Sequence, residues 1–405
     1  MVTRWRSAAV GAAAVVLVVA PLGAGAGYAG DAAAPSPARA VAAAPAVEDF
    51  PVLTPAVAAR LDAAVKKAMA DANVPGVMVA LSAPGKGEYV RAFGISDKAT
   101  DAPMATDLYM RIGSVTKTFT VTALLQLVDE GRAALDDPIG QYVDGVPNGD
   151  RITLRELAGM RSGLFNYSAD EDFYKALTSD PQRVFTPQEL LGYAFKHPVL
   201  FEPGADFLYC NTNLILLGLV VEKVTGQKLE DYVNREVVAA AGLKHTLFPT
   251  GAEFPSPHAH GYTDQTASGK TEDATNWNPS WGWAAGAMIS DLADMRSWAK
   301  TLATGTLLTP ATQAERLKVD PALPGAGYGL GIFNVEGWIG HNGSLPGYGT
   351  LVVYLPQAGA TMVVLLNTDI AHQGSEPSTL FGEAITKVVT PEHVFSLPAQ
   401  SVTGH

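Results

Sequence analysis

The stretch from Arg111 to Lys117 reads Arg-Ile-Gly-Ser-Val-Thr-Lys, and it directly precedes a long apolar segment, Thr118 to Val128. We predict a helix that begins at Ser114 and stops at Gly131, because glycine accepts the left-handed conformation that commonly ends a helix. Residues three apart share one face of a helix. Ser114 and Lys117 are therefore predicted to project together from its first turn.

This Ser-x-x-Lys spacing has a specific chemical meaning. A serine hydroxyl is a weak nucleophile until a base takes its proton, and a buried lysine with a lowered pKa can be that base. The positive end of a helix also favours developing negative charge. The spacing alone is not specific, because Ser297 and Lys300 repeat it inside a predicted helix at 291–304, where a serine is ordinarily a surface residue.

A second motif, Tyr209-Cys210-Asn211, lies at the turn before a strongly apolar helix that closes at Gly226. A tyrosine beside a lysine could act as a phenolate or pass a proton to a leaving group. The asparagine could orient the lysine and donate to a substrate carbonyl. The alternative for Tyr209 is a core tyrosine whose hydroxyl bonds to the backbone.

A third motif, His341-Asn342-Gly343, lies between two predicted strands and is followed by Ser344. The glycine would let a substrate approach the strand backbone closely. The N–H groups of Ser344 and Ser114 could polarise a carbonyl together. His341 could carry a proton or a charge at neutral pH, although a lone histidine is more often structural.

The three motifs in this order resemble the signatures of the penicillin-recognising serine hydrolases, in the branch of class C β-lactamases and D-alanyl-D-alanine carboxypeptidases. The resemblance extends over about 57–368 and includes Glu202-Pro203-Gly204. It implies an acyl-enzyme on Ser114 with Lys117 as its base, and neither a cofactor nor a metal. It implies two sets of site residues: catalytic Ser114, Lys117, Tyr209 and His341, and substrate-binding Asn211, Asn342, Gly343 and Ser344.

Strand patterns lie at both ends of the chain and helix patterns fill the middle. We therefore predict an α/β (α+β) fold of the β-lactamase/transpeptidase-like kind, with an antiparallel sheet flanked by helices and an all-helical lobe. The N-terminal hairpin should pair with the C-terminal strands, and a cleft between the lobes should hold the site. Within this plan, 162–180 and 245–280 are predicted as loops and 284–289 as a strand.

The predicted division of the chain starts with a secretory signal. Arg4 and Arg6 precede an apolar run at 8–20, and small residues follow at 24–26, which favours a cleaved signal peptide over a membrane anchor. The protein should then be secreted or held in the cell envelope, without a transmembrane segment. The predicted parts are a signal peptide at 1–30, a disordered leader at 31–50, a hydrolase domain at 51–390 with its helical lobe at about 135–280, and a C-terminal tail at 391–405.

Composition limits the partners. The formal charge is -12 without a basic block, which excludes nucleic acid as an expected partner. The single cysteine, Cys210, excludes an internal disulfide and a cysteine-based metal site. We expect a monomer that acts on a small peptide, ester or β-lactam.

The expected activity is that of an exported serine hydrolase, either a D-alanyl-D-alanine carboxypeptidase-like peptidase or a β-lactamase-related penicillin-binding enzyme. Two departures from the resemblance weaken recognition of a free C-terminal carboxylate: Asn342 replaces the usual Thr or Ser, and 329–340 contains no Arg or Lys. An esterase or a D-amino-acid amidase on the same scaffold is therefore one alternative. A non-catalytic cell-wall-binding protein is the other.

Overall fold

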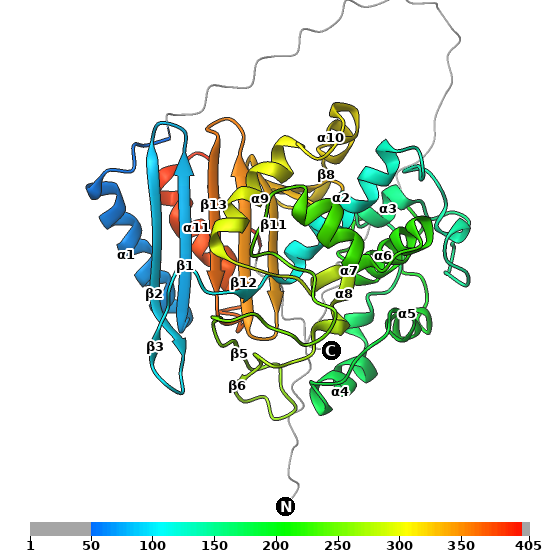
Figure 1. The fold of residues 1–405 in the computed structure, drawn as a ribbon, viewed down its shortest axis with the longest axis horizontal. Helices are drawn as coiled ribbons and strands as arrows, with labels where there is room; N and C mark the ends of the chain where they lie inside the picture. Colours follow the sequence, from blue (N-terminus) through cyan, green and yellow to red (C-terminus); the bar gives the residue numbers. More distant parts are fainter. Residues whose placement is uncertain (1–49, 399–405) are drawn as a thin grey trace, which may run out of the picture.

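The computed structural model of the chain describes residues 50–398, and its centre is a mixed-length antiparallel sheet (Figure 1). The strands pair far-separated parts of the sequence, because the N-terminal hairpin lies against the last strand of the chain. The sheet has nine strands, in the order β3 (Ala102–Pro103), β2 (Gly87–Asp97), β1 (Gly76–Ala83), β13 (Ala360–Leu366), β12 (Tyr348–Leu355), β11 (Trp338–Leu345), β10 (Phe333–Val335), β9 (Ala326–Tyr328) and β8 (Asp320–Leu323).

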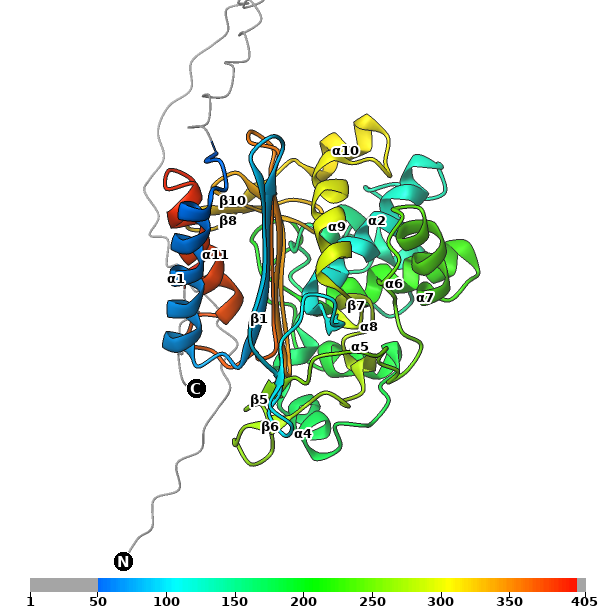
Figure 2. The same ribbon diagram turned by 60° about the vertical axis from the view of Figure 1, so that its left-hand side comes forward.

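Helices cover both faces of this sheet (Figure 2). α1 (Pro55–Ala72) and α11 (Pro377–Val389) lie together on one face, and α9 (Leu292–Thr304) and α2 (Thr116–Asp129) lie on the other. Every residue of β12 and β13 is buried, because helices cover the sheet on both sides. The remaining helices form the lobe beyond α2: α3 (Leu154–Ala158), α4 (Glu171–Ser179), α5 (Pro187–Phe195), α6 (Asn211–Thr225), α7 (Leu229–Tyr232), α8 (Trp283–Gly286) and α10 (Pro310–Arg316).

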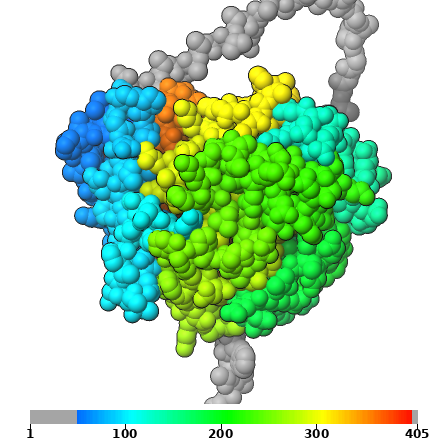
Figure 3. All heavy atoms as spheres, in the orientation of Figure 1, coloured from blue at the N-terminus to red at the C-terminus, as the bar shows by residue number. Residues whose placement is uncertain are grey.

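The predicted architecture is confirmed, with the terminal hairpin and the C-terminal strands in one sheet and the helices beside it. In the space-filling view, the N-terminal segments form one side of the molecule and the central residues form the other (Figure 3). Every helix within 50–398 is too short or too polar to cross a membrane. The predicted signal peptide at 1–30 and almost all of the leader at 31–50 lie outside the described residues.

α2 is the helix around which the two layers meet, and it is buried on nearly every side. Its hydroxyl groups do not lack partners, since burial of an unpaired polar group is costly. Each threonine of its first turns bonds to a different neighbouring segment: Thr116 accepts from the Met288 N–H at 3.1 Å, Thr118 accepts from the Trp298 indole at 2.8 Å, Thr120 donates to the Ala284 carbonyl at 2.8 Å, and Thr122 accepts from Arg316 at 2.6 Å.

Two local predictions were wrong. The predicted loop at 162–180 contains α4, which Asp170 caps by accepting from the Phe173 N–H at 2.9 Å. Phe173 and Leu177, one turn apart, are both buried against the lobe. The first half of the predicted strand at 284–289 belongs to α8, and only Ile289–Ser290 forms a short strand, β7.

The physical reason at α8 is close packing of small residues. A Cβ at Gly218 of α6 would lie 2.8 Å from the Cβ of Ala284, so the two helices pack nearly backbone to backbone. The small apolar residues at 284–286 therefore reflect helix packing rather than the pleat of a sheet. The predicted loop at 245–280 is largely irregular but contains the two-residue strands β5 (Tyr262–Thr263) and β6 (Glu272–Asp273).

The domain extends beyond the boundary predicted at 390. Phe395 is buried, its N–H donates to the Thr386 hydroxyl at 3.0 Å, and its ring lies against Gly382 of α11. The Trp338 indole also donates to the His393 carbonyl at 3.0 Å. Residues 391–398 therefore pack on the outer helix layer.

We expect Phe395→Ala to lower the free energy of unfolding by about 3 kcal/mol, because it removes a buried aromatic ring. Urea unfolding followed by tryptophan fluorescence measures this change. Ser396→Ala alters the exposed neighbour and should change stability by less than about 0.5 kcal/mol. Equal stability of the two variants would mean that this segment is a free tail.

Candidate active site

Ser114 lies in a short 3₁₀ turn, Gly113–Val115, that leads directly into α2. From Met110 to Leu125 it is the one residue that is not buried. The first N–H groups of a helix lack partners within the helix. Ser114 is thus partly exposed to solvent, whereas the residues around it at the helix start are buried. Its position at the helix start is the one that the first motif predicts.

Lys117 lies one turn further along α2 and is fully buried. Its Nζ atom lies 2.9 Å from the Ser114 Oγ atom and donates to the Ala285 carbonyl at 2.8 Å. Burial lowers the pKa of Lys117 to about 7, while Cys210 and Glu376 act in the opposite direction with smaller effects. A substantial fraction of this lysine is therefore a neutral amine at neutral pH.

Tyr209 reaches the same place from the segment before α6. Its ring lies below the Lys117 amine, 4.9 Å from Nζ to the ring centre, and its hydroxyl lies near enough to Ser114 to affect its own pKa. Burial raises the pKa of Tyr209 well above its usual value, and this effect exceeds that of Ser114, which lowers it. Tyr209 is a neutral phenol at this site, so the phenolate considered from the sequence is not supported.

Asn211 is the first residue of α6, two residues earlier than the sequence predicted for the helix start. Its side-chain amide donates to the Ser168 hydroxyl at 3.0 Å, and its backbone N–H donates to Asn166 at 3.1 Å. The expected orienting bond from Asn211 to Lys117 is not formed. The Ala285 carbonyl holds the lysine instead, and a backbone acceptor of this kind has no sequence signature.

His341 lies within strand β11 rather than between two strands. The Tyr328 hydroxyl lies 3.1 Å from Nε2, and Nδ1 bonds to the Asn342 carbonyl, so Nδ1 carries the proton and Nε2 accepts. Burial, together with the nearby Lys117 charge, lowers the pKa of His341 to about 3. The expectation of a charge on His341 at neutral pH is wrong, because a cation would be desolvated beside another cation.

The strand β11 has a free edge where it passes Ser114. β10 pairs only with Trp338–Gly340, which leaves 341–345 without a partner strand on that side. The backbone around Ser114 packs there. A Cβ at Gly343 would lie 2.3 Å from the Ile112 carbonyl oxygen and 3.0 Å from the Ser114 nitrogen, and a Cβ at Gly113 would lie 3.0 Å from the Ser344 nitrogen.

This close approach explains the glycine of the third motif. The contact requires hydrogen in place of a side chain, so the backbone nitrogens of Ser114 and Ser344 come together beside the nucleophile. Two N–H groups around one point are the arrangement that stabilises the oxyanion of an acyl-transfer intermediate. The structure therefore brings all eight sequence-predicted residues to the region where α2, α6 and β11 meet.

Glu376 is a neighbour of the site that the sequence analysis missed. It directly precedes α11 and is half-buried, and its Oε2 atom accepts from the Asn342 side-chain amide at 2.8 Å. Burial raises the pKa of Glu376, while Asn342 and Lys117 both lower it. Nothing in the sequence links an acidic residue before Pro377 to the third motif.

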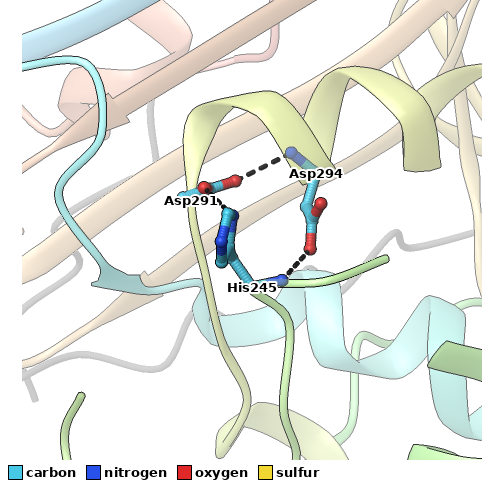
Figure 4. A group of neighbouring side chains, drawn as sticks. All are labelled: His245, Asp291 and Asp294. Carbon is cyan, nitrogen blue, oxygen red and sulfur yellow. Dashed lines mark hydrogen bonds and ion pairs between the residues drawn. The ribbon is translucent and has the colours of Figure 1, made fainter. Parts of the chain in front are cut away.

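His245, Asp291 and Asp294 form a separate cluster of ionisable groups at the start of α9 (Figure 4). Asp291 accepts from the Asp294 N–H and lies 2.8 Å from His245 Nδ1, and Asp294 accepts from the His245 N–H at 2.6 Å. Asp291 is the N-cap of α9. These bonds fasten the loop at 245–246 to the helix, and they account for the cluster without a ligand.

Comparison with known proteins gives a consistent picture. The family model described as Beta-lactamase matches residues 61–379. A D-aminopeptidase of Brucella anthropi is 31% identical over 341 residues, which cover 78% of this chain and 64% of that protein. The chain thus spans slightly less than two thirds of that relative's length.

Two solved structures are similar along nearly their whole length. A D-stereospecific amidohydrolase from Streptomyces sp. has a TM-score of 0.73 and 30% identity, covering 82% of this chain and 98% of that one. A D-amino acid amidase from Ochrobactrum anthropi SV3, complexed with L-phenylalanine, has a TM-score of 0.69 and 28% identity, covering 83% and 96%.

The buried amine gives a prediction about stability that does not depend on any activity. The pKa of Lys117 is lower in the folded protein, about 7, than its ordinary value of 10.5. Between pH 7 and pH 10.5 the unfolded chain binds more protons than the folded protein does, so the free energy of unfolding rises with pH. Relative to Lys117→Met, the free energy of unfolding of the natural protein should increase by on the order of 3 kcal/mol from pH 7 to pH 10.

Urea unfolding of both proteins across this range measures the difference, and effects common to both cancel. Lys67→Met, at an exposed position on α1, supplies the baseline for removing a lysine from the surface. A difference between the natural protein and Lys117→Met that does not change with pH would contradict the lowered pKa.

Proposed function

Because the chain belongs to the β-lactamase family of serine hydrolases, we propose that it hydrolyses amides of D-amino acids through an acyl-enzyme on Ser114. The observation that carries the proposal is the 2.9 Å contact between Lys117 Nζ and Ser114 Oγ. Among residues 50–398, Lys117 has no carboxylate within ion-pair distance that would hold it as an ammonium ion.

In this mechanism the neutral amine of Lys117 accepts the Ser114 proton while Ser114 Oγ attacks the substrate carbonyl carbon. The amine keeps its bond to the Ala285 carbonyl throughout, so only the hydroxyl proton has to move. A base whose pKa lies near the working pH is unprotonated in a large fraction of the molecules and is still basic enough to take the proton. The two backbone N–H groups, of Ser114 and Ser344, would stabilise the negative charge that develops on the carbonyl oxygen.

Collapse of the tetrahedral intermediate requires a proton on the departing nitrogen. The neutral phenol of Tyr209 is the proposed donor, because its hydroxyl lies near Ser114 and its raised pKa keeps the proton on the phenol until the nitrogen departs. Lys117 then returns the proton taken from Ser114 to Tyr209. Water attacks the acyl-enzyme in the second half-reaction, and the same groups act in reverse.

His341 has a different role in this proposal from the proton carrier expected from the sequence. Its ring nitrogens bond to Tyr328 and to the Asn342 carbonyl, and it remains neutral. We assign it to positioning: it fixes the backbone of β11 beside Ser114 and adds no cation near Lys117.

The choice of substrate rests on the relatives and on charge. A D-aminopeptidase, a D-stereospecific amidohydrolase and a D-amino acid amidase are among the proteins most similar to this chain. The carboxypeptidase expected first from the sequence would bind a free carboxylate, yet the third motif carries Asn342 bonded to Glu376 and no arginine. The amidase alternative is therefore better supported than the carboxypeptidase or β-lactamase activity. A non-catalytic wall-binding protein would not need a lysine with a pKa near neutrality.

The first test compares D-phenylalanine amide, L-phenylalanine amide, D-Ala-D-Ala and a cephalosporin as substrates. We expect the D-amide to be hydrolysed fastest, with Ser114→Ala reducing kcat/KM by at least about 1,000-fold. The matched control is Ser297→Ala, which changes the second Ser-x-x-Lys at an exposed position of α9 and should retain full activity. Fastest turnover of D-Ala-D-Ala would select the carboxypeptidase instead.

The second test separates the proposed role of Tyr209 from that of the nucleophile. An amide nitrogen needs a proton to leave, whereas p-nitrophenolate does not. Tyr209→Phe should lower kcat/KM for D-phenylalanine amide by about 100-fold and for the matching p-nitrophenyl ester by less than about tenfold. Equal losses for both substrates in steady-state assays would contradict a role as leaving-group acid.

A further inference from the structure

The half-buried carboxylate of Glu376 is a charge that the proposed mechanism does not use. It is not part of a structural ion pair, because within residues 50–398 it has no Lys, Arg or His within ion-pair distance. Its single side-chain partner is the amide of Asn342, the middle residue of the third motif. The bond to Asn342 places the carboxylate beside the third motif, and its charge acts on the pKa of both Lys117 and Tyr209.

The strand geometry indicates which part of a substrate would pass this carboxylate. If the scissile carbonyl accepts from the Ser344 N–H, the substrate residue that bears it lies along the free edge of β11. In an antiparallel pair one residue exchanges both bonds with the same partner, and its C-terminal neighbours run toward the N-terminal end of the facing strand. The leaving group then extends from Ser344 past Gly343 toward Asn342 and Glu376.

We propose that Glu376 determines the charge that the leaving group is allowed to carry, favouring cationic and neutral leaving groups and disfavouring carboxylates. The inference rests on the proposed acyl transfer at Ser114 and deepens it. Like charges repel with a strength that grows as water is excluded, and a half-buried carboxylate is only partly screened. Asn342 holds the carboxylate toward the strand, so the amide acts as a positioning residue for Glu376.

The test uses three D-alanyl amides that differ only in leaving-group charge: D-Ala-Gly, D-alanyl-glycinamide and D-alanyl-2-aminoethylamide. For the natural protein we expect kcat/KM to be highest for the ammonium form and lowest for the carboxylate form. Glu376→Gln should raise the ratio of carboxylate to neutral substrate by about tenfold and lower the ratio of ammonium to neutral substrate. Ratios are the readout because any change in the basicity of Lys117 affects the three substrates alike.

The matched control is Glu383→Gln on the same helix, α11, where the carboxylate pairs with Lys387 away from the site. It should leave all three ratios unchanged. Unchanged ratios in Glu376→Gln, with turnover retained, would overturn the inference. A carboxylate substrate that is preferred by the natural protein would overturn it as well.

A second measurement keeps the inference separate from the proposed function. The three D-alanyl amides can be titrated into Ser114→Ala, which cannot form an acyl-enzyme, so that calorimetry measures their binding without turnover. Dissociation constants that follow the same charge order, and lose it when Glu376→Gln is added to Ser114→Ala, would support Glu376 even if no D-alanyl amide were hydrolysed. Loss of the charge order here, with D-amide hydrolysis intact, would leave the amidase proposal standing and remove the role of Glu376.

Discussion

The site depends on removing one ammonium group from water. Lys117 is enclosed by α2, α8 and the ring of Tyr209, and no carboxylate among the described residues neutralises it within ion-pair distance. Burial of an unpaired charge is expensive, so the amine gives up its proton near neutral pH rather than near 10. The fold therefore carries a destabilising group at its centre, and that cost is what leaves the amine unprotonated at neutral pH and free to accept a proton from Ser114.

The surroundings of Lys117 are consistent with this constraint. His341 stands near it, but burial and the lysine keep the imidazole neutral. Tyr209 is a phenol rather than a phenolate, which would otherwise stabilise the ammonium form. Cys210 and Glu376 both act to raise the pKa of Lys117, but the effect of burial is larger, so the pKa of the lysine remains lowered. Moving a carboxylate closer would raise that pKa and make the base less available.

The sequence predicts the parts of this arrangement that local patterns encode. Thr54 and Pro55 mark the start of α1, Thr153 and Glu156 form the capping box of α3, and the hairpin at 76–97 follows from two β-type runs on either side of a Pro-Gly turn at 84–87. The spacing of Ser114 and Lys117 places both on one face of α2. The resemblance to a known family then correctly links three segments separated by about a hundred residues each, which no periodicity could do.

Other features lack such a signal because they depend on contacts between distant backbones. The Ala285 carbonyl orients Lys117 by virtue of where α8 packs, and alanine at that position identifies nothing. Glu376 approaches Asn342 because α11 begins beside β11, although 34 residues separate them. The neutral state of His341 likewise follows from burial between Tyr328 and Lys117, which a histidine in a sequence does not reveal.

The two glycines at the centre of the site connect its chemistry to the sheet. Gly113 and Gly343 allow the backbone before α2 to touch the free edge of β11, at a separation that any Cβ would prevent. That edge is free because β10 begins at Phe333, which pairs with Gly340, and no residue of β10 lies beside 341–345. A longer β10 would fill the edge with hydrogen bonds and leave no N–H of Ser344 for a substrate. The short strand is therefore as necessary to the proposed reaction as the serine, since it leaves open the one place where nucleophile and N–H donors can face the same carbonyl.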